Sequence, residues 1–305
     1  MTDSTPKILL SGASGLIGAH LVRTLGQNRI QTVQLFRKEN SSPAPGHLAW
    51  DPNAQTPVLD LQPLEGLDAA IHLSGANIAA HRWTESYKRE LVASRVNTTL
   101  ALTRVLGSLK QPPRVLLCAS ANGIYGDRGD EILPEAAAPG PGFLAETCVL
   151  WEQAADAARA LGIRVVNLRF GVGLSTEGGA LKRMLPLFRL GLGGRLGSGQ
   201  QWMSWIALPD MIRSILHAWK TESLAGPVNI VAPVPATNAD FTRALGQALH
   251  RPTILPAPAF ALRLAFGEVA DEAFLASVRA VPERLLQSGF HFDFPEISAA
   301  FKALL

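Results

Sequence analysis

Residues 7–26 read KILLSGASGLIGAHLVRTLG, and this pattern sets the fold expected for the chain. A short apolar run, Lys7–Leu10, leads into glycines at positions 12, 15 and 18, after which apolar residues recur at helical spacing. In such a unit the first glycine allows a sharp turn, the second lets backbone N–H groups approach a diphosphate, and the third lets helix and strand pack closely. Because a second apolar run follows at Thr32–Phe36, the context favours a dinucleotide-binding unit over a turn that needs small residues for packing alone.

Short apolar runs alternate with helical periodicity along much of the chain, as in βαβ units. Helices are expected at Leu16–Leu25, Glu90–Leu109 and Glu146–Leu161. Six buried parallel strands are expected, at Lys7–Leu10, Thr32–Phe36, Ala69–Leu73, Val115–Ala119, Val165–Leu168 and Val228–Val231. The sequence therefore predicts an α/β fold built on a Rossmann-type, doubly wound parallel sheet.

The pattern changes after Leu168. Residues 171–201 are rich in glycine around a short apolar helix, Leu181–Leu190, and residues 233–305 mix helices with proline-rich turns. We expect a Rossmann domain over residues 1–172, to which a segment near 205–232 returns. A second, smaller mixed C-terminal lobe is expected over residues 173–305.

Composition excludes several classes of protein. The 305 residues carry 28 lysines and arginines against 25 aspartates and glutamates, with no basic run longer than three, so we expect neither a nucleic-acid nor a membrane partner. No apolar stretch approaches the ~20 residues that cross a bilayer, and Met1–Pro6 is polar, which favours a cytoplasmic protein. Cys118, Cys148 and the scattered histidines lack the spacing of metal ligands, so no metal is expected.

The end of the second expected strand indicates which dinucleotide binds. NAD-selective proteins usually carry an acidic residue there, which accepts from the ribose hydroxyls, but this chain has Phe36-Arg37-Lys38, with Glu39 one residue further on. A guanidinium can hold the 2′-phosphate of NADP in a bidentate fork, whereas a carboxylate would repel it. The pattern favours NADP(H); the alternative is that Arg37 and Lys38 form only a solvated strand end.

Further motifs carry a resemblance to a known family. The runs IHLSG at 71–75, SANGIYG at 120–126 and RFGV at 169–172 resemble the extended short-chain dehydrogenase/reductase superfamily. Trp151-Glu152, GGA at 178–180, FRLGLGG at 188–194 and GSGQ at 197–200 are similar to its atypical, epimerase/dehydratase-like subfamily labelled "epimerase family protein", which ends in a small domain of undefined role.

The resemblance implies a set of cofactor contacts. Phe36 and Arg37 would line the adenosine end, Leu73 and Ser74 would run under the ribose and diphosphate, and Val172 would lie near the nicotinamide. Arg95 would add a positive charge for the phosphates, unless it is only a solvated helix residue. The implied residues are Gly12, Ser14, Gly15, Leu16, Ile17, Gly18, Phe36, Arg37, Leu73, Ser74, Gly75, Glu90, Arg95 and Val172. In this superfamily two exposed helices commonly form a dimer interface, so the resemblance implies a homodimer.

The usual catalytic pair of the superfamily, Tyr-x-x-x-Lys on one helix face, is absent from the sequence. The residues four beyond Tyr87 and Tyr125 are leucine and glycine, and the expected pair positions fall on Leu144 and Cys148. The serine position of the superfamily falls on Ala121.

The remaining catalytic candidates are Ser120, Tyr125 and Cys148. For Tyr125 we favour a contact to substrate or cofactor, and for Cys148 a small core residue. Gln200 and Trp202 lie in a glycine-rich loop and are candidates for the wall of a substrate pocket; packing between the lobes is the alternative.

Three functional hypotheses follow. The leading one is an NADP(H)-dependent oxidoreductase or epimerase-like enzyme acting on an unidentified small substrate. The second is a catalytically silent, NADP(H)-responsive binding protein. The third, a conventional nucleotide-sugar epimerase, requires an acid–base pair that the sequence does not reveal.

Overall fold

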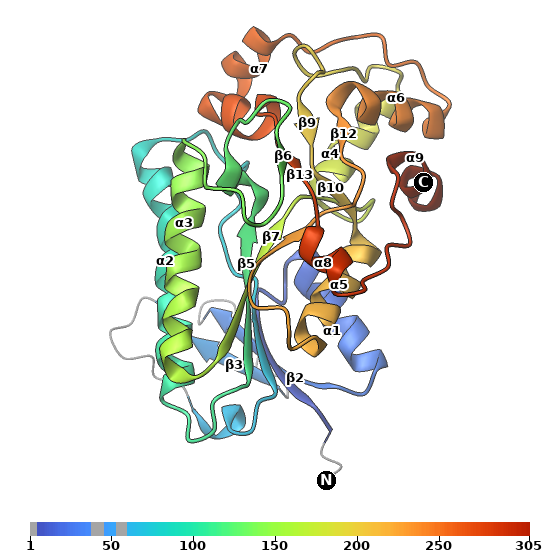
Figure 1. Cartoon of the computed structure of the whole chain (residues 1–305). Coiled ribbons are helices and arrows are strands. Elements are labelled where there is room, and N and C mark those ends of the chain that lie inside the picture. The colour runs from blue at the N-terminus through green and yellow to red at the C-terminus, as the bar shows by residue number, and fades with distance from the viewer. Residues whose placement is uncertain (1–4, 38–45, 53–59) are drawn as a thin grey trace.

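The computed structural model describes residues 5–37, 46–52 and 60–305. Its centre is a seven-stranded sheet of order β11-β7-β5-β4-β1-β2-β3 in which every neighbouring pair is parallel (Figure 1). The strands are β1 (Lys7–Ser11), β2 (Gln31–Arg37), β3 (His47–Trp50), β4 (Ala69–His72), β5 (Val115–Ala121), β7 (Arg164–Phe170) and β11 (Gly226–Ile230). The predicted Rossmann-type α/β fold is confirmed, and all six expected strands are present.

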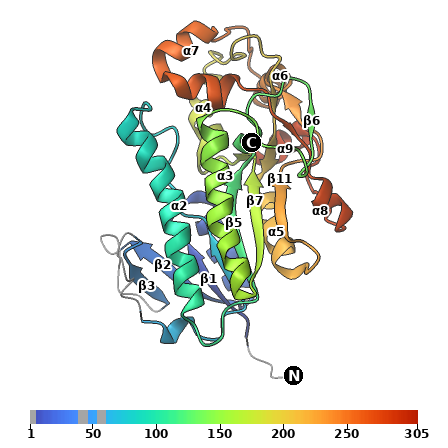
Figure 2. The same ribbon diagram turned by 60° about the vertical axis from the view of Figure 1, so that its left-hand side comes forward.

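Helices cover both faces of this sheet (Figure 2). On one face α1 (Leu16–Gln27) and α5 (Leu208–Lys220) pack on Ile8 and Leu10 of β1. On the other face α2 (Glu85–Gly107) and α3 (Phe143–Asp156) pack on Leu9. Adjacent residues of β1 thus point to opposite helical layers, as the two-residue period of a strand requires.

Several elements differ from the expected ones. Strand β3 was not expected, because only four residues pair at the sheet edge and most of them keep some exposure. Helix α2 begins five residues earlier than expected because the hydroxyl of Thr84 accepts from the backbone N–H of Tyr87 and caps the helix. Helix α3 begins at Phe143 and ends at Asp156, where the chain tightens into the 3₁₀ helix Ala157–Leu161.

Smaller elements gather beyond the carboxyl ends of the strands (Figure 1). Part of this group packs around a separate core that contains Phe188, Trp205, Phe241 and Phe301. The helices are α4 (Gly179–Arg189), α6 (Asn238–Leu249), α7 (Ala259–Phe266), α8 (Glu283–Gln287) and α9 (Ile297–Leu304), with a π-helical turn at Ala270–Leu275. The short strands form the pairs β10 (Trp205–Ala207) with β8 (Val172–Leu174), β12 (Ala236–Thr237) with β9 (Trp202–Met203), and β13 (Arg279–Ala280) with β6 (Ile132–Leu133).

The two parts of the chain are interleaved. Helix α5 and strand β11, from the later part of the sequence, complete the main sheet and its helical layer. Strand β6 leaves the Rossmann half and pairs with β13 near the C-terminus. Among the described residues, no helix is both long and apolar enough to cross a membrane.

His72 places an ionisable group in the middle of this fold. It ends β4 and has no exposed surface, with Ser11 Oγ 2.5 Å from its Nδ1 and Thr98 Oγ1 3.3 Å from its Nε2. Burial lowers the pKa of His72 to about 4 from an ordinary value of 6.5. Between pH 6.5 and pH 4 the imidazole of His72 is protonated in the unfolded chain but neutral in the folded chain. Lowering the pH through this range therefore lowers the free energy of unfolding.

The His72→Asn variant is expected to lose this part of the pH dependence. Between pH 7.5 and 4.5 the imidazole should account for about 2–3 kcal/mol of the fall in unfolding free energy, because each pKa unit corresponds to about 1.4 kcal/mol. Urea unfolding of both proteins at the two pH values measures the difference, since the carboxylates are common to both. Equal pH slopes would show that His72 does not control the acid response.

Candidate functional site

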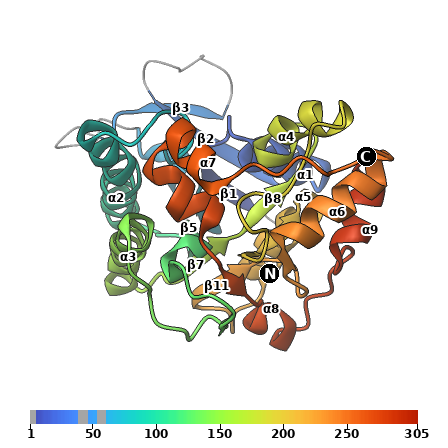
Figure 3. The same cartoon turned by 90° about the horizontal axis from the view of Figure 1, so that it is seen from above.

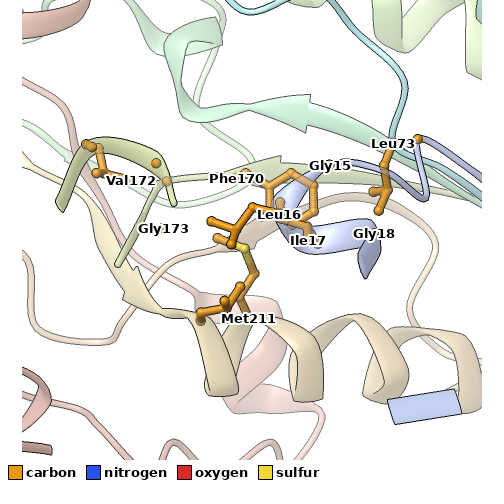
Figure 4. Close-up of a pocket in the computed structure, with 14 residues that line it drawn as sticks. Gly15, Leu16, Ile17, Gly18, Leu73, Phe170, Val172, Gly173 and Met211 are labelled. Carbon is orange, nitrogen blue, oxygen red and sulfur yellow. The ribbon is translucent and has the colours of Figure 1, made fainter. Parts of the chain in front are cut away.

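A pocket of about 400 Å³ opens at the carboxyl ends of β1, β4 and β7 (Figure 4). The loop between β1 and α1 forms one wall, and the start of α5 together with the β7–β8 turn forms the other. The first turn of α4 closes one side. The lining residues are Gly12, Gly15, Leu16, Ile17, Gly18, Leu73, Phe170, Gly171, Val172, Gly173, Gly179, Ala180, Leu208 and Met211.

Close backbone contacts leave no room for a side chain at two glycines of the β1–α1 loop. Gly12 has φ +76°, and a Cβ there would lie 2.8 Å from the carbonyl carbon of Leu73 in the neighbouring loop. A Cβ on Gly18 would lie 2.2 Å from the carbonyl oxygen of Gly12, so only glycine lets α1 pack this closely on the turn. At Gly15, which precedes the helix, no side chain caps the first turn of α1, so its N–H groups can serve an anion.

Seven of the residues expected to contact a cofactor line this pocket, and they come from three separate stretches of chain: Gly12, Gly15, Leu16, Ile17, Gly18, Leu73 and Val172. Ser14, Ser74 and Gly75 lie in the same loops but do not line it. Phe36 and the exposed Arg37 end β2, whose residue Leu35 pairs with Ser11 of β1. Glu90 is exposed on α2.

Arg95 is held against the loop that follows β4. Its guanidinium donates to the carbonyl oxygens of Ala76 at 2.9 Å and Leu91 at 3.0 Å, and lies 5.1 Å from the ring centre of Trp151. A Cβ on Gly75 would lie 3.5 Å from Arg95 Cζ. Burial lowers the pKa of Arg95, and no carboxylate forms a salt bridge with it in the part of the chain that the structure describes. The group is therefore fixed rather than freely solvated.

Two of the catalytic candidates belong to a buried polar network near the ends of β5 and β7. Arg169 donates from Nε and Nη2 to the two carboxylate oxygens of Glu152, at 2.8 and 2.9 Å. Ser120 Oγ donates to the same carboxylate at 2.7 Å. Tyr125 is fully buried, donates to Asn229 Oδ1 at 2.7 Å and accepts from Arg169 Nη1 at 3.0 Å. Burial raises the pKa of Tyr125, and these bonds favour a structural role over the expected ligand contact.

The third candidate also lies in the core. Cys148 is buried on α3, and burial raises the pKa of its thiol to about 12, so the thiol stays protonated and weakly nucleophilic near neutral pH. Leu144, one turn earlier, offers no titratable group. Neither position of the superfamily pair can therefore exchange a proton with a substrate.

The two residues of the glycine-rich loop that were expected to contact substrate, Gln200 and Trp202, differ in their surroundings. Gln200 is exposed, whereas the indole N–H of Trp202 donates to Asp130 Oδ1 at 2.7 Å. The guanidinium of Arg279 lies 4.2 Å from a ring centre of Trp202. These contacts agree with the alternative of packing between segments, and neither residue lines the pocket at the carboxyl ends of the strands.

The pocket also contains residues that sequence reasoning missed. Leu208 and Met211 come from α5, and Phe170 and Gly171 from the end of β7. Phe170 and Gly171 belong to the RFGV motif that the sequence analysis singled out. Leu208 and Met211 have no such local signal, because α5 reaches the pocket only where the chain returns to the sheet. Within residues 5–37, 46–52 and 60–305, no group of three or more His, Cys, Asp or Glu side chains is arranged to hold a metal ion.

Two family models match the chain. Residues 8–231 match the NAD dependent epimerase/dehydratase family, and residues 257–304 match a domain of unknown function, DUF1731. The first match contains the β1–α1 loop and all of the central sheet except Lys7, and the second contains α7, α8 and α9.

Individual proteins of this family are similar to the chain over almost its full length. The epimerase family protein Mb2239 of Mycobacterium bovis is 42% identical over 293 residues, covering 96% of this chain and 95% of that protein. The human epimerase family protein SDR39U1 is 34% identical over 307 residues, covering 98% and 99%.

Solved structures extend the comparison. The crystal structure of human SDR39U1 (isoform 2) with NADPH has a TM-score of 0.88 at 32% identity, covering 98% of both chains. A nucleoside-diphosphate sugar epimerase from Corynebacterium glutamicum has a TM-score of 0.79 at 34% identity, covering 99% of this chain and 58% of that one. MoeE5 in complex with UDP-glucose and NAD, at 19% identity and a TM-score of 0.73, shares the fold. The chain belongs to the NAD dependent epimerase/dehydratase family.

Proposed function

We propose that this protein binds NADPH in the pocket at the carboxyl ends of β1 and β4 and acts as an oxidoreductase or epimerase-like enzyme on a small substrate. The close packing of the β1–α1 loop carries the proposal. Gly12 and Gly18 leave no room for a Cβ, and the uncapped first turn of α1 faces a pocket that a dinucleotide can enter.

The preference for NADPH over NADH rests on Arg37. This residue ends β2 and is exposed, and none of the described carboxylates forms a salt bridge with it. A guanidinium in that position suits the 2′-phosphate of NADP. The human relative of known structure has NADPH bound, whereas MoeE5 has NAD, so fold alone does not select the cofactor. Lys38 and Glu39 lie outside the described residues.

The chain's own residues limit the chemistry at this site. When bound, the cofactor supplies or accepts a hydride at its nicotinamide ring. Phe170, Val172 and Met211 give part of the pocket an apolar wall. Because Leu144 and Cys148 cannot exchange a proton near neutrality, proton transfer must use an atypical acid or a water molecule. This argues against a conventional nucleotide-sugar epimerase.

A catalytically silent, NADPH-responsive protein is the second candidate function. Ser120 and Tyr125 favour it, because both hydroxyls bond to protein groups and neither is available to a ligand. Following NADPH oxidation by absorbance with aldehydes, ketones and nucleotide sugars separates the two functions. Sustained turnover of any substrate excludes the silent protein.

Calorimetric titration of the Arg37→Ala variant tests the cofactor proposal. We expect wild-type protein to bind NADPH more tightly than NADH. The variant should lose about 10- to 100-fold in NADPH affinity with little change for NADH, because charge-assisted hydrogen bonds to a phosphate contribute about 1.5–3 kcal/mol. Arg23→Ala, which removes an exposed cation from α1, controls for net charge. NADH binding as tight as NADPH in the wild type would contradict the assignment.

A further inference from the structure

Large apolar side chains are exposed at the end of the molecule that carries α7. Ile254, Leu264, Phe260 and Leu190 are the most exposed, with 78%, 76%, 72% and 72% of their surface accessible. Together with three neighbours they form what we call the apolar cap: Leu187, Leu190, Leu192, Ile254, Leu255, Phe260 and Leu264. Exposed aliphatic side chains this numerous mark an interaction surface.

The segments that carry the cap lie side by side. Arg251 Nε donates to the carbonyl oxygen of Arg189 at 2.8 Å, and the N–H of Ala257 donates to the carbonyl oxygen of Arg195 at 2.8 Å. A Cβ on Gly191 would lie 3.5 Å from the Pro252 ring. The end of α4 is thus joined to the connection that leads into α7, and Figure 3 shows these elements together when the molecule is seen from above.

The two segments that carry the cap contain an excess of cations. Residues 178–209 contain four cations and residues 241–267 contain three, yet neither segment contains an aspartate or glutamate. The remaining sequence holds 21 of the 28 cations against all 25 carboxylates, so it is net acidic. All seven cations of the two segments are exposed: Lys182, Arg183, Arg189, Arg195, Arg243, Arg251 and Arg263.

Most of these cations are available to an anionic partner. Arg243 and Arg263 pair with Asp240 and Asp271. Arg189, Arg195 and Arg251, which border the cap directly, form no salt bridge with any carboxylate in the described ranges. A partner for this surface must therefore be apolar in its interior and negatively charged at its rim.

We propose that the apolar cap and its surrounding arginines dock on the surface of an anionic lipid bilayer. Protruding Leu, Ile and Phe side chains reach the acyl boundary while neighbouring arginines contact the headgroups, as in interfacial membrane binders. A nucleic acid would satisfy the cations but not the aliphatic side chains. A second copy packed by two-fold symmetry would bring the arginines of one cap toward those of the other, which costs electrostatic energy.

This proposal differs from the expectation that no membrane partner exists. That expectation depended on the absence of a basic run, which is the signal that a linear sequence offers. Here the cations come from two segments separated in the sequence, and contacts such as those between Arg189 and Arg251 and between Arg195 and Ala257 bring them to one surface.

Vesicle sedimentation with the full-length protein tests the proposal. We expect binding to phosphatidylcholine vesicles containing a quarter phosphatidylglycerol, and at least tenfold weaker binding to pure phosphatidylcholine vesicles or at high salt. Ile254→Ser combined with Leu264→Ser, and separately Arg189→Glu combined with Arg251→Glu, should each reduce partitioning at least tenfold. Leu150→Ser with Leu286→Ser removes exposed leucines from α3 and α8 and should leave partitioning unchanged.

Three outcomes would overturn the proposal. The first is no partitioning onto anionic vesicles at low salt, and the second is partitioning that the cap variants leave intact. The third is a dimer, seen by light scattering, that the Ile254→Ser/Leu264→Ser variant dissociates, because the cap would then face a second copy. Circular dichroism of each variant ensures that lost binding reflects the surface and not unfolding.

Discussion

Alanine at position 18 is expected to weaken NADPH binding about a hundredfold or more, the largest loss we expect from adding a single methyl group to this protein. A Cβ on Gly18 would lie 2.2 Å from the Gly12 carbonyl oxygen and 2.8 Å from Ala13 Cα, both backbone atoms that cannot rotate away. The first turn of α1 must therefore move off the β1 turn, which displaces the N–H groups offered to the diphosphate. Calorimetric titration with NADPH measures the loss.

Gly26→Ala is the matched control in the same helix. A Cβ on Gly26 meets no atom within 4 Å, so alanine there should raise stability by about 0.5–1 kcal/mol through its better helix propensity and leave NADPH binding unchanged. Thermal unfolding of both variants separates binding from folding. Wild-type NADPH affinity in a folded Gly18→Ala protein would show that the close packing of this loop is not what prepares the site.

The sheet could be predicted because buried parallel strands have a strong local signal. The Val115–Ala119 run is continuous and apolar, and it is a central strand with neighbours on both sides. Strand β3 lacks this signal, because an edge strand pairs on one side only and needs little apolar sequence. The missed start of α2 has a similar cause: Thr84 extends the helix by a cap, not by hydrophobic periodicity.

The site was predictable only where its residues act locally. Each glycine of the β1–α1 loop has a backbone role that its spacing reveals. Tyr125 has no such signal, because its partner Asn229 lies 104 residues away and Arg169 lies 44 residues away. From the sequence Tyr125 was a candidate for ligand contact, whereas the fold places its hydroxyl in a buried network. Chemistry that depends on burial becomes visible only when distant segments are brought together.

The same network leads to the largest stability effect we expect. Glu152→Ala should lower the unfolding free energy by about 3–5 kcal/mol, because removing one partner of a buried ion pair leaves the other charge uncompensated. The side chains of Arg169 and Glu152 are only 7% and 12% exposed, and the guanidinium makes two hydrogen bonds to the carboxylate. Ser120 would lose its acceptor as well. Urea unfolding followed by circular dichroism measures the change.

Two further variants separate charge from packing in this effect. Asp271→Ala breaks the ion pair with Arg263, in which the side chains of Asp271 and Arg263 are 49% and 57% exposed. This variant should lower the unfolding free energy by no more than about 1 kcal/mol. Combining Glu152→Ala with Arg169→Met removes both buried charges and should recover much of the loss, because the isolated guanidinium and not the missing contact is the costly element. If Glu152→Ala were as mild as Asp271→Ala, the buried pair would not secure β7 to α3, and the position of Phe170 at the pocket would have to depend on the sheet alone.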